Sequence, residues 1–165
     1  MVASKARCRV GGGVRTAARA RQVVELGAHR VIVGTAAFTP ALQEIRDAVG
    51  ADRILIALDS KAGKIVVQGW QEATGFTAEQ VVNRLEPFCG GFLCTYVDKE
   101  GMMQGTDLDW FRRLRAATSH ELTAAGGITT LDDVRALQAM GVHAALGMAI
   151  YTGRLDLAEL ARMNA

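Results

Sequence analysis

The sequence predicts an α/β fold in which six parallel strand–helix units form one domain. Short apolar runs typical of buried strands alternate with amphipathic helical stretches along the chain, and the joints between them are short. At 165 residues, with 50% hydrophobic and 22% charged residues, the chain can bury one core but is short for two domains. A segment near its start recurs near its end, which indicates an internal repeat.

Each expected strand is followed by an expected helix. The helices carry apolar side chains spaced to cover a sheet, and right-handed crossovers then place every strand-to-helix loop at one edge of that sheet. The longest connection, residues 60–77, contains an alternating stretch, Lys64–Gln68, that predicts a small hairpin. The expected strands are Cys8–Val10, Arg30–Val33, Arg53–Leu58, Gly91–Tyr96, Leu122–Ala125 and Ala144–Leu146. The expected helices are Ala17–Leu26, Pro40–Val49, Ala78–Phe88, Leu108–Ala117, Leu131–Met140 and Leu155–Met163.

Charge and cysteine content argue against several classes of protein. The net charge is +2, from 19 basic and 17 acidic residues. The basic residues are scattered, so we assign them to solvated helix faces and expect no nucleic-acid site. No apolar run approaches the roughly 18 residues of a membrane helix, so no membrane contact is expected. Cys8 and Cys94 fall in strand-like runs, which favours buried thiols, and a reducing cytoplasm fits. The three histidines lack metal-ligand spacing, so no metal site is expected.

The repeat pairs "GGVRTAARARQVVELGAHRVIVGTAAF" from Gly12 with "GGITTLDDVRALQAMGVHAALGMAIY" from Gly126. Both copies begin with two glycines, continue through a small polar residue (Thr16 or Thr130) into a helix, and end in a strand closed by glycine. Each copy therefore brings two glycine-rich strand ends side by side.

These paired strand ends predict two anion sites. Glycine permits a positive φ and a close approach of the backbone, and the following helix N-terminus offers unused N–H groups. Two such sites predict a ligand with a phosphate at each end, whereas the alternative is that the glycines only form tight turns. The candidate phosphate-binding residues are Gly12, Gly13, Arg15, Gly34 and Thr35 at the first site and Gly126, Gly127, Gly147 and Met148 at the second.

Carboxylates at strand ends predict acid–base chemistry. Asp59 directly follows the apolar run "ILIAL", and Asp98 and Glu100 follow the next strand, beside Thr95. Carboxylates that face each other across the mouth of a barrel are what a proton-transfer isomerisation needs. Trp70, in the long connection, either stacks on a planar base or packs within its own loop.

In combination these motifs resemble the histidine-biosynthesis isomerase that acts on phosphoribosyl-formimino-aminoimidazole-carboxamide ribotide. The resemblance rests on "CRVGGGVRT", "VIVGTAAF", "IALDSKAGKIVVQGWQEATG", "VDKEGMMQGTDLDWFRRL" and "AAGGITTLDDVRALQAMGVHAALGMAIYTGRL". It implies a (β/α)8 TIM barrel that catalyses an Amadori rearrangement of an aminoaldose to an aminoketose, without metal or organic cofactor. Its partner is a small bis-phosphate ribotide.

The resemblance also implies residue roles. The two glycine sites would each hold one substrate phosphate. Asp59 would be the general acid or support ring opening, Thr95 would orient the sugar, and Trp70 would stack on the imidazole carboxamide. Glu100 stands where the family usually has aspartate, so a catalytic carboxylate is kept there with one methylene more.

In this family the triple-glycine loop follows strand three, so we expect strands three to eight, about six units of an incomplete barrel. We expect open sheet edges that invite self-association, and impaired turnover, because the family's proposed general base lies on strand one. Two other functions fit the same residues. One is a non-catalytic phosphate-ligand-binding fragment, and the other is the cyclase subunit of imidazole-glycerol-phosphate synthase, against which the "QGWQE" loop argues. An isomerase that also accepts phosphoribosylanthranilate is a further alternative.

Overall fold

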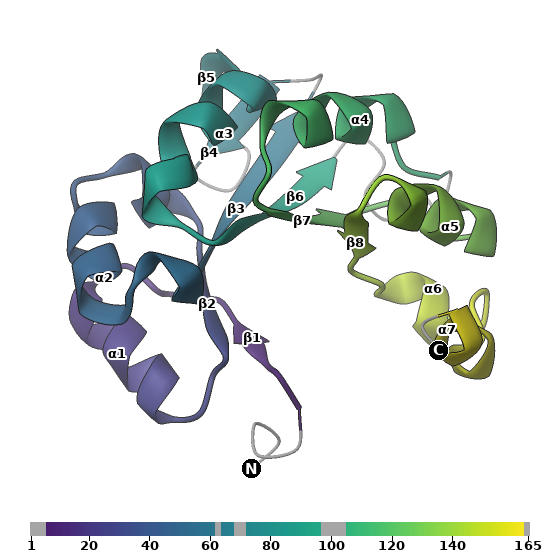
Figure 1. Ribbon diagram of the computed structural model, residues 1–165, viewed down its shortest axis with the longest axis horizontal. Coiled ribbons are helices and arrows are strands. Elements are labelled where there is room, and N and C mark those ends of the chain that lie inside the picture. The colour runs from purple at the N-terminus through teal and green to yellow at the C-terminus, as the bar shows by residue number, and fades with distance from the viewer. Residues whose placement is uncertain (1–5, 62–63, 68–71, 97–104, 164–165) are drawn as a thin grey trace.

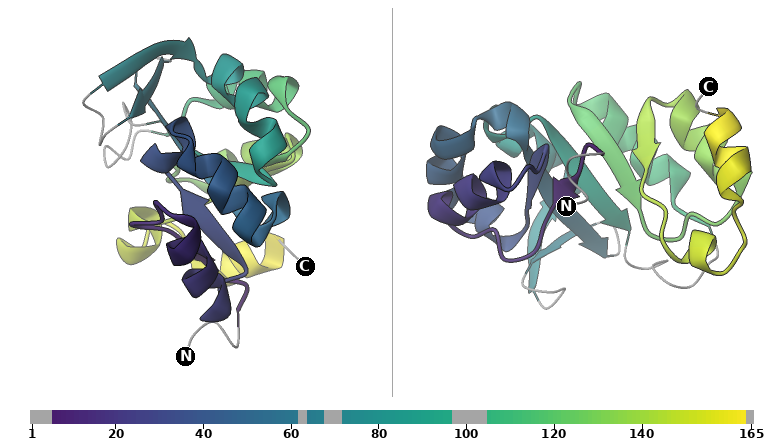
Figure 2. Two further views of the ribbon diagram at one scale, coloured as in Figure 1. Left: turned by 90° about the vertical axis from the view of Figure 1, so that its left-hand side faces the viewer. Right: turned by 90° about the horizontal axis from the view of Figure 1, so that it is seen from below.

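A computed structural model of the chain describes residues 6–61, 64–67, 72–96 and 105–163, and its main feature is one strongly curled parallel sheet (Figure 1). Six parallel strands follow the order β1-β2-β3-β6-β7-β8, which for this part of the sheet is also their order in the chain. Helices cover its convex side, as the views in Figure 2 also show. These strands are β1 (Arg9–Val10), β2 (Arg30–Val33), β3 (Ile54–Lys61), β6 (Gly91–Tyr96), β7 (Glu121–Ala125) and β8 (Val142–Ala144).

The helices begin where the sequence supplies a capping side chain. The hydroxyls of Thr16, Thr77 and Thr130 and the carboxylate of Asp107 each accept the backbone N–H of the residue three positions later. Such a cap satisfies one of the N–H groups that the first turn leaves unpaired. The α-helices are α1 (Ala17–Glu25), α2 (Ala41–Val49), α3 (Ala78–Leu85), α4 (Leu108–Ala117), α5 (Leu131–Ala139), α6 (Met148–Tyr151) and α7 (Leu157–Met163). Short 3-10 helices are η2 (Thr35–Phe38), η3 (Ala51–Arg53) and η4 (Glu86–Phe88).

The predicted hairpin is confirmed. Strands β4 (Lys64–Val67) and β5 (Glu72–Thr77) run antiparallel, and β4 also pairs with the end of β3, where Asp59 lies opposite Val66. The carboxyl half of β3 therefore has β4 and β6 as partners, which holds the strand end that carries Asp59.

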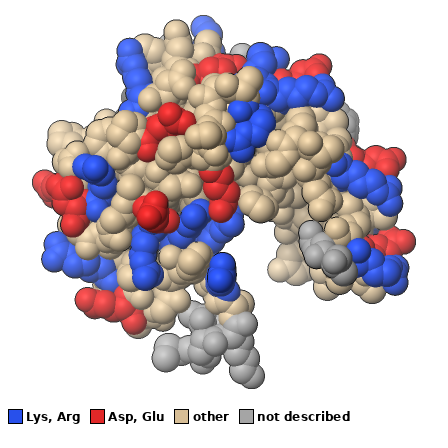
Figure 3. Space-filling model, in the orientation of Figure 1, with Lys and Arg blue, Asp and Glu red and all other residues tan. Residues whose placement is uncertain are grey.

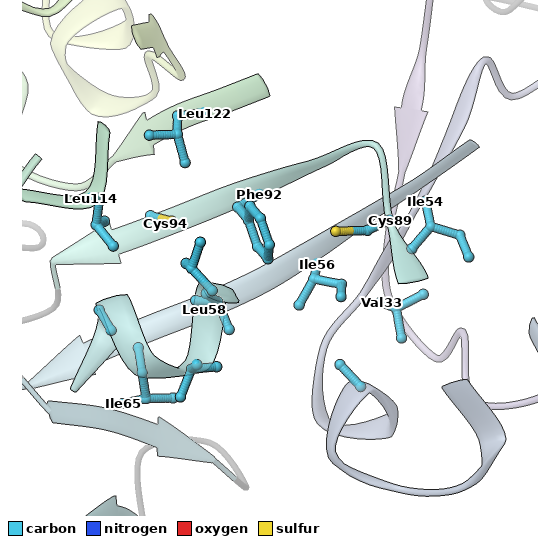
Figure 4. Packing of buried hydrophobic residues seen from close by; sticks show 14 of the residues in the cluster. Val33, Ile54, Ile56, Leu58, Ile65, Cys89, Phe92, Cys94, Leu114 and Leu122 are labelled. Carbon is cyan, nitrogen blue, oxygen red and sulfur yellow. The ribbon is translucent and has the colours of Figure 1, made fainter. Parts of the chain in front are cut away.

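The core lies between the convex face of the sheet and the helices. Alternate side chains of the central strands point toward the helices, and all of them are fully buried: Ile54, Ile56, Leu58, Phe92 and Cys94 (Figure 4). The intervening positions face the concave side, because successive side chains of a strand point to opposite faces. The core therefore fixes which side chains of each strand are left for the concave face.

The six predicted strand–helix units are confirmed, but several of their bounds differ. For example, β3 runs to Lys61 rather than Leu58 and so contains Asp59. β8 begins and ends two residues earlier than expected, because Leu146 already belongs to the connection that leads into α6. Cys94 is buried as predicted, but Cys8 is only half-buried, since it precedes the first strand rather than lying within it. Among the described residues, no helix has both the length and the apolar character needed to cross a bilayer.

Candidate active site

Two pairs of adjacent strands end in glycine at the same edge of the sheet. β1 and β2 are parallel neighbours and lead into the residues of the first cradle, Gly12, Gly13, Gly34 and Thr35. β7 and β8 are also parallel neighbours and lead into the second cradle, Gly126, Gly127, Gly147 and Met148. The two halves of the sequence repeat thus become two equivalent strand ends, one near each side of the sheet.

The backbone of the two cradles has nearly the same shape. φ is +94° at Gly12 and +86° at Gly126, then +68° at Gly13 and +73° at Gly127. Two consecutive positive φ angles require glycine, because an L side chain is strained in that region. The chain then returns to an extended residue, Thr16 or Thr130, that caps the next helix. The repeat therefore encodes one backbone geometry twice.

The second strand of each cradle ends in a short helical turn. Gly34 (φ −95°, ψ −113°) precedes η2 and Gly147 (φ −123°, ψ −104°) precedes α6. Each cradle thus combines the N-termini of two helical segments, whose first N–H groups have no partner within the helix. Converging N–H groups of this kind suit a phosphate.

Space is left at both cradles. A Cβ added at Gly12, Gly13, Gly34 or Gly147 would meet no described atom within 4 Å. At the second cradle a cavity of about 330 Å³ opens between the ends of β7 and β8. Its lining includes Gly126, Gly127, Ile128, Thr129, Gly147 and Met148. The glycines therefore keep free a volume large enough for a phosphate group.

Asp59 and Thr95 lie between the two cradles. They are direct partners across the parallel strands β3 and β6, and both belong to the concave side of the sheet. Thr95 also abuts the second cradle, because a Cβ added at Gly126 would lie 3.3 Å from its Cγ2. Burial raises the pKa of the neighbouring thiol Cys94, and the negative charge of Asp59 adds to that effect. Across the sheet the order is therefore first cradle, Asp59, Thr95, second cradle.

The remaining candidate residues are placed as follows. Arg15 is exposed, two residues beyond Gly13 at the rim of the first cradle. Trp70 and Glu100, together with Asp98, lie outside the described residues, so their roles stay predictions. Within the described part of the chain, no three His, Cys, Asp or Glu side chains are grouped as metal ligands would be.

A polar network at the opposite end of the strands was not predicted from the sequence. It joins Arg9, Arg30, Glu121 and Thr123 across the concave face. The basic residues were assigned to solvated helix faces, and for Arg9 and Arg30 that prediction is wrong because they lie on strands. Elsewhere charges of both signs alternate over the face shown in Figure 3. The three ionic residues are far apart in the chain, so no local motif points to them.

Comparison with known proteins identifies the family. The family model described as "Histidine biosynthesis protein" matches residues 1–156. The chain belongs to this histidine biosynthesis family. Similar proteins include one from Methanocaldococcus jannaschii, 37% identical over 151 residues, which make up 90% of this chain and 64% of that protein. A protein from Myxococcus xanthus is 41% identical over 157 residues, 93% of this chain and 66% of the relative.

Both relatives carry the name 1-(5-phosphoribosyl)-5-((5-phosphoribosylamino)methylideneamino) imidazole-4-carboxamide isomerase. A third relative with that name, from Methanothrix thermoacetophila, is 40% identical over 154 residues, 91% of this chain and 64% of its own length. The chain thus spans 64% to 66% of the length of these histidine biosynthesis relatives.

Proposed function

We propose that this chain carries the substrate site of a histidine-biosynthesis isomerase that converts an aminoaldose into an aminoketose. The substrate class is a small ribotide with a phosphate at each end, as in the names of the relatives. One observation supports this above the others: Asp59 and Thr95 are adjacent and stand between two cradles of matching backbone geometry. A ligand with two terminal phosphates and a reacting centre between them fits this order.

Asp59 is the candidate acid of this reaction. The rearrangement opens the sugar ring by protonating its oxygen and moves a proton from C2 to C1. The C2 hydroxyl loses its proton as the ketone forms, so the protons balance and no external oxidant or reductant is consumed. A carboxyl group on the concave side, at the end of a strand, suits a donor of the first proton, which supports this role. Thr95, its neighbour in register, offers a hydroxyl that can hold the sugar in the same region.

Binding and turnover measurements on the purified chain test the proposal. Calorimetry with the two-phosphate ribotide of the relatives is compared with ribose 5-phosphate, which carries one phosphate. We expect the ribotide to bind at least tenfold more tightly, because its second phosphate binds with a high effective concentration once the first is seated. Equal affinities would contradict a two-cradle site. Product analysis by chromatography then separates catalysis from binding alone, since binding without turnover would support a non-catalytic phosphate-ligand binder.

A further inference from the structure

Glu121 bridges two arginines from the far side of the sheet. Its Oε1 lies 2.7 Å from Nη2 of Arg9, and its Oε2 lies 3.0 Å from Nη1 of Arg30. The first contact is an ion pair without hydrogen-bond alignment, whereas Arg30 donates a hydrogen bond. Arg9 also donates through Nη1 to the hydroxyl of Thr123, at 2.9 Å. The four side chains form a cross-sheet clamp on the concave face.

The clamp depends on the curl of the sheet. In sheet order, three strands separate β1 from β7. In a flat sheet these two strands would be about 19 Å apart, at roughly 4.8 Å for each strand spacing, which is beyond the reach of an arginine side chain. The contacts exist because the sheet bends back on itself, and Arg9 lines a hollow of about 410 Å³ on its concave side.

Gly91 makes room for the clamp. It is the register partner of Glu121 on β6. A Cβ added there would lie 2.7 Å from the backbone oxygen of Glu121, 2.9 Å from its Cβ, and 2.9 Å from Cδ2 of Leu55. Gly91 does not have a positive φ, so its backbone conformation does not require glycine. Glycine is needed here because a larger residue would not fit. The missing side chain at Gly91 therefore leaves the space beside it for Glu121.

Each strand of the clamp runs directly into a cradle. Arg9 lies three residues before Gly12, Arg30 lies four before Gly34, and Glu121 lies five before Gly126. The clamp thus ties both strands of the first cradle to the first strand of the second cradle. Since strands are stiff over so few residues, a change in the spacing at the clamp shifts the cradles as well.

We propose that Arg9, Arg30 and Glu121 are positioning residues that set the distance between the two cradles. This inference rests on the proposed function, because it concerns a ligand that must reach both cradles at once. The half-buried setting strengthens the ionic contacts, with Glu121 23% exposed and Arg30 18% exposed. A ligand with two phosphates needs this distance, whereas a ligand with one phosphate does not.

The test compares these two ligands on clamp variants of the full chain. Glu121→Gln keeps the side-chain shape and removes the charge. We expect the affinity for the two-phosphate ribotide to fall at least tenfold and the affinity for ribose 5-phosphate to stay within twofold. Asp109→Asn, which removes one exposed carboxylate of an ion pair on α4, is the matched control and should change neither affinity.

The outcomes separate the clamp from the site itself. Equal losses for both ligands, or no loss for either, would contradict the positioning role. If the unsubstituted chain does not prefer the ribotide, the proposed function fails and the clamp inference fails with it. Should Glu121→Gln not fold, Arg9→Lys keeps the charge, removes one nitrogen contact, and gives the same comparison with a smaller expected loss.

Discussion

Asp59 on β3 and Thr95 on β6 are register partners at the carboxyl ends of adjacent parallel strands. On one side of this pair lie β2 and β1 with the first cradle, and on the other lie β7 and β8 with the second. The pair therefore occupies the centre of a symmetric arrangement. A substrate whose phosphates are seated in both cradles would present its middle to Asp59 and Thr95.

Asp59→Asn tests the proposed role of this carboxyl group. The amide keeps the size of the side chain but cannot donate a proton as the acid does, so we expect the isomerisation rate to fall about 10²- to 10⁴-fold. The affinity for the two-phosphate ribotide should change less than threefold, because the cradles are intact. Single-turnover measurements with protein in excess detect even a slow reaction. Asp47→Asn, on the exposed side of α2, is the control, and an equal loss of rate in both variants would contradict the assignment.

Gly12→Ala and Gly50→Ala separate backbone strain from ligand binding. Gly12 has φ +94° and Gly50 has φ +84°, and an added Cβ at either position meets no described atom within 4 Å. Both substitutions should lower the free energy of unfolding by about 1 kcal/mol, because alanine is strained at positive φ. Only Gly12→Ala should also weaken phosphate binding, since Gly50 lies at the end of α2. Urea unfolding and calorimetry measure the two effects, and a similar loss of binding in Gly50→Ala would contradict the cradle assignment.

Local sequence patterns predicted most of the fold because each unit is short and self-contained. The strands Arg30–Val33 and Gly91–Tyr96 and the helix Leu108–Ala117 have the expected bounds. Apolar runs bounded by glycine and by capping side chains are enough to predict where these elements begin and end. The short turns η2 and α6 were not predicted, because a single helical turn after a glycine has no periodicity to detect.

The candidate site was predictable where it depends on the repeat. Gly12 and Gly126 occupy equal positions in the two copies, so equal backbone geometry could be expected from the sequence. The contact between Arg9 and Glu121 could not, because 112 residues separate them and only the curl of the sheet brings them together. Arg9 was therefore interpreted as one of the solvated basic residues, although it meets Glu121 across the concave face.

Gly91→Ala tests how tightly β6 and β7 are packed. The added Cβ would lie well inside van der Waals distance of the backbone oxygen of Glu121, which cannot rotate away as a flexible side chain can. We expect the free energy of unfolding to fall by about 1–3 kcal/mol, the usual cost of inserting a methyl group into a packed region. Urea unfolding of the variant measures this. A loss below about 0.5 kcal/mol would mean that β7 shifts easily, and would contradict a sheet built around Glu121.

Alkaline pH should destabilise the protein through its buried thiols. Burial raises the pKa of Cys89 from an ordinary value of 9.0 to about 12, and the pKa of the Cys94 thiol is raised in the same direction. The folded state therefore keeps these protons at a pH where the unfolded chain has released them. The free energy of unfolding therefore keeps its full value below pH 9 and falls as the pH rises from about 9 to about 12.

Urea unfolding at pH 8, 9, 10 and 11 measures this loss. A single thiol contributes at most about 1.4 kcal/mol per pH unit to the slope in this window. Cys89→Ala should lower stability at pH 8 by the cost of a small cavity and should make the decline above pH 9 shallower. Val82→Ala removes buried apolar atoms from α3 without removing a titrating group, so its curve should lie below that of the unsubstituted protein by a constant amount. If the Cys89→Ala curve ran parallel to the Val82→Ala curve, the Cys89 thiol would not contribute to the loss of stability at alkaline pH.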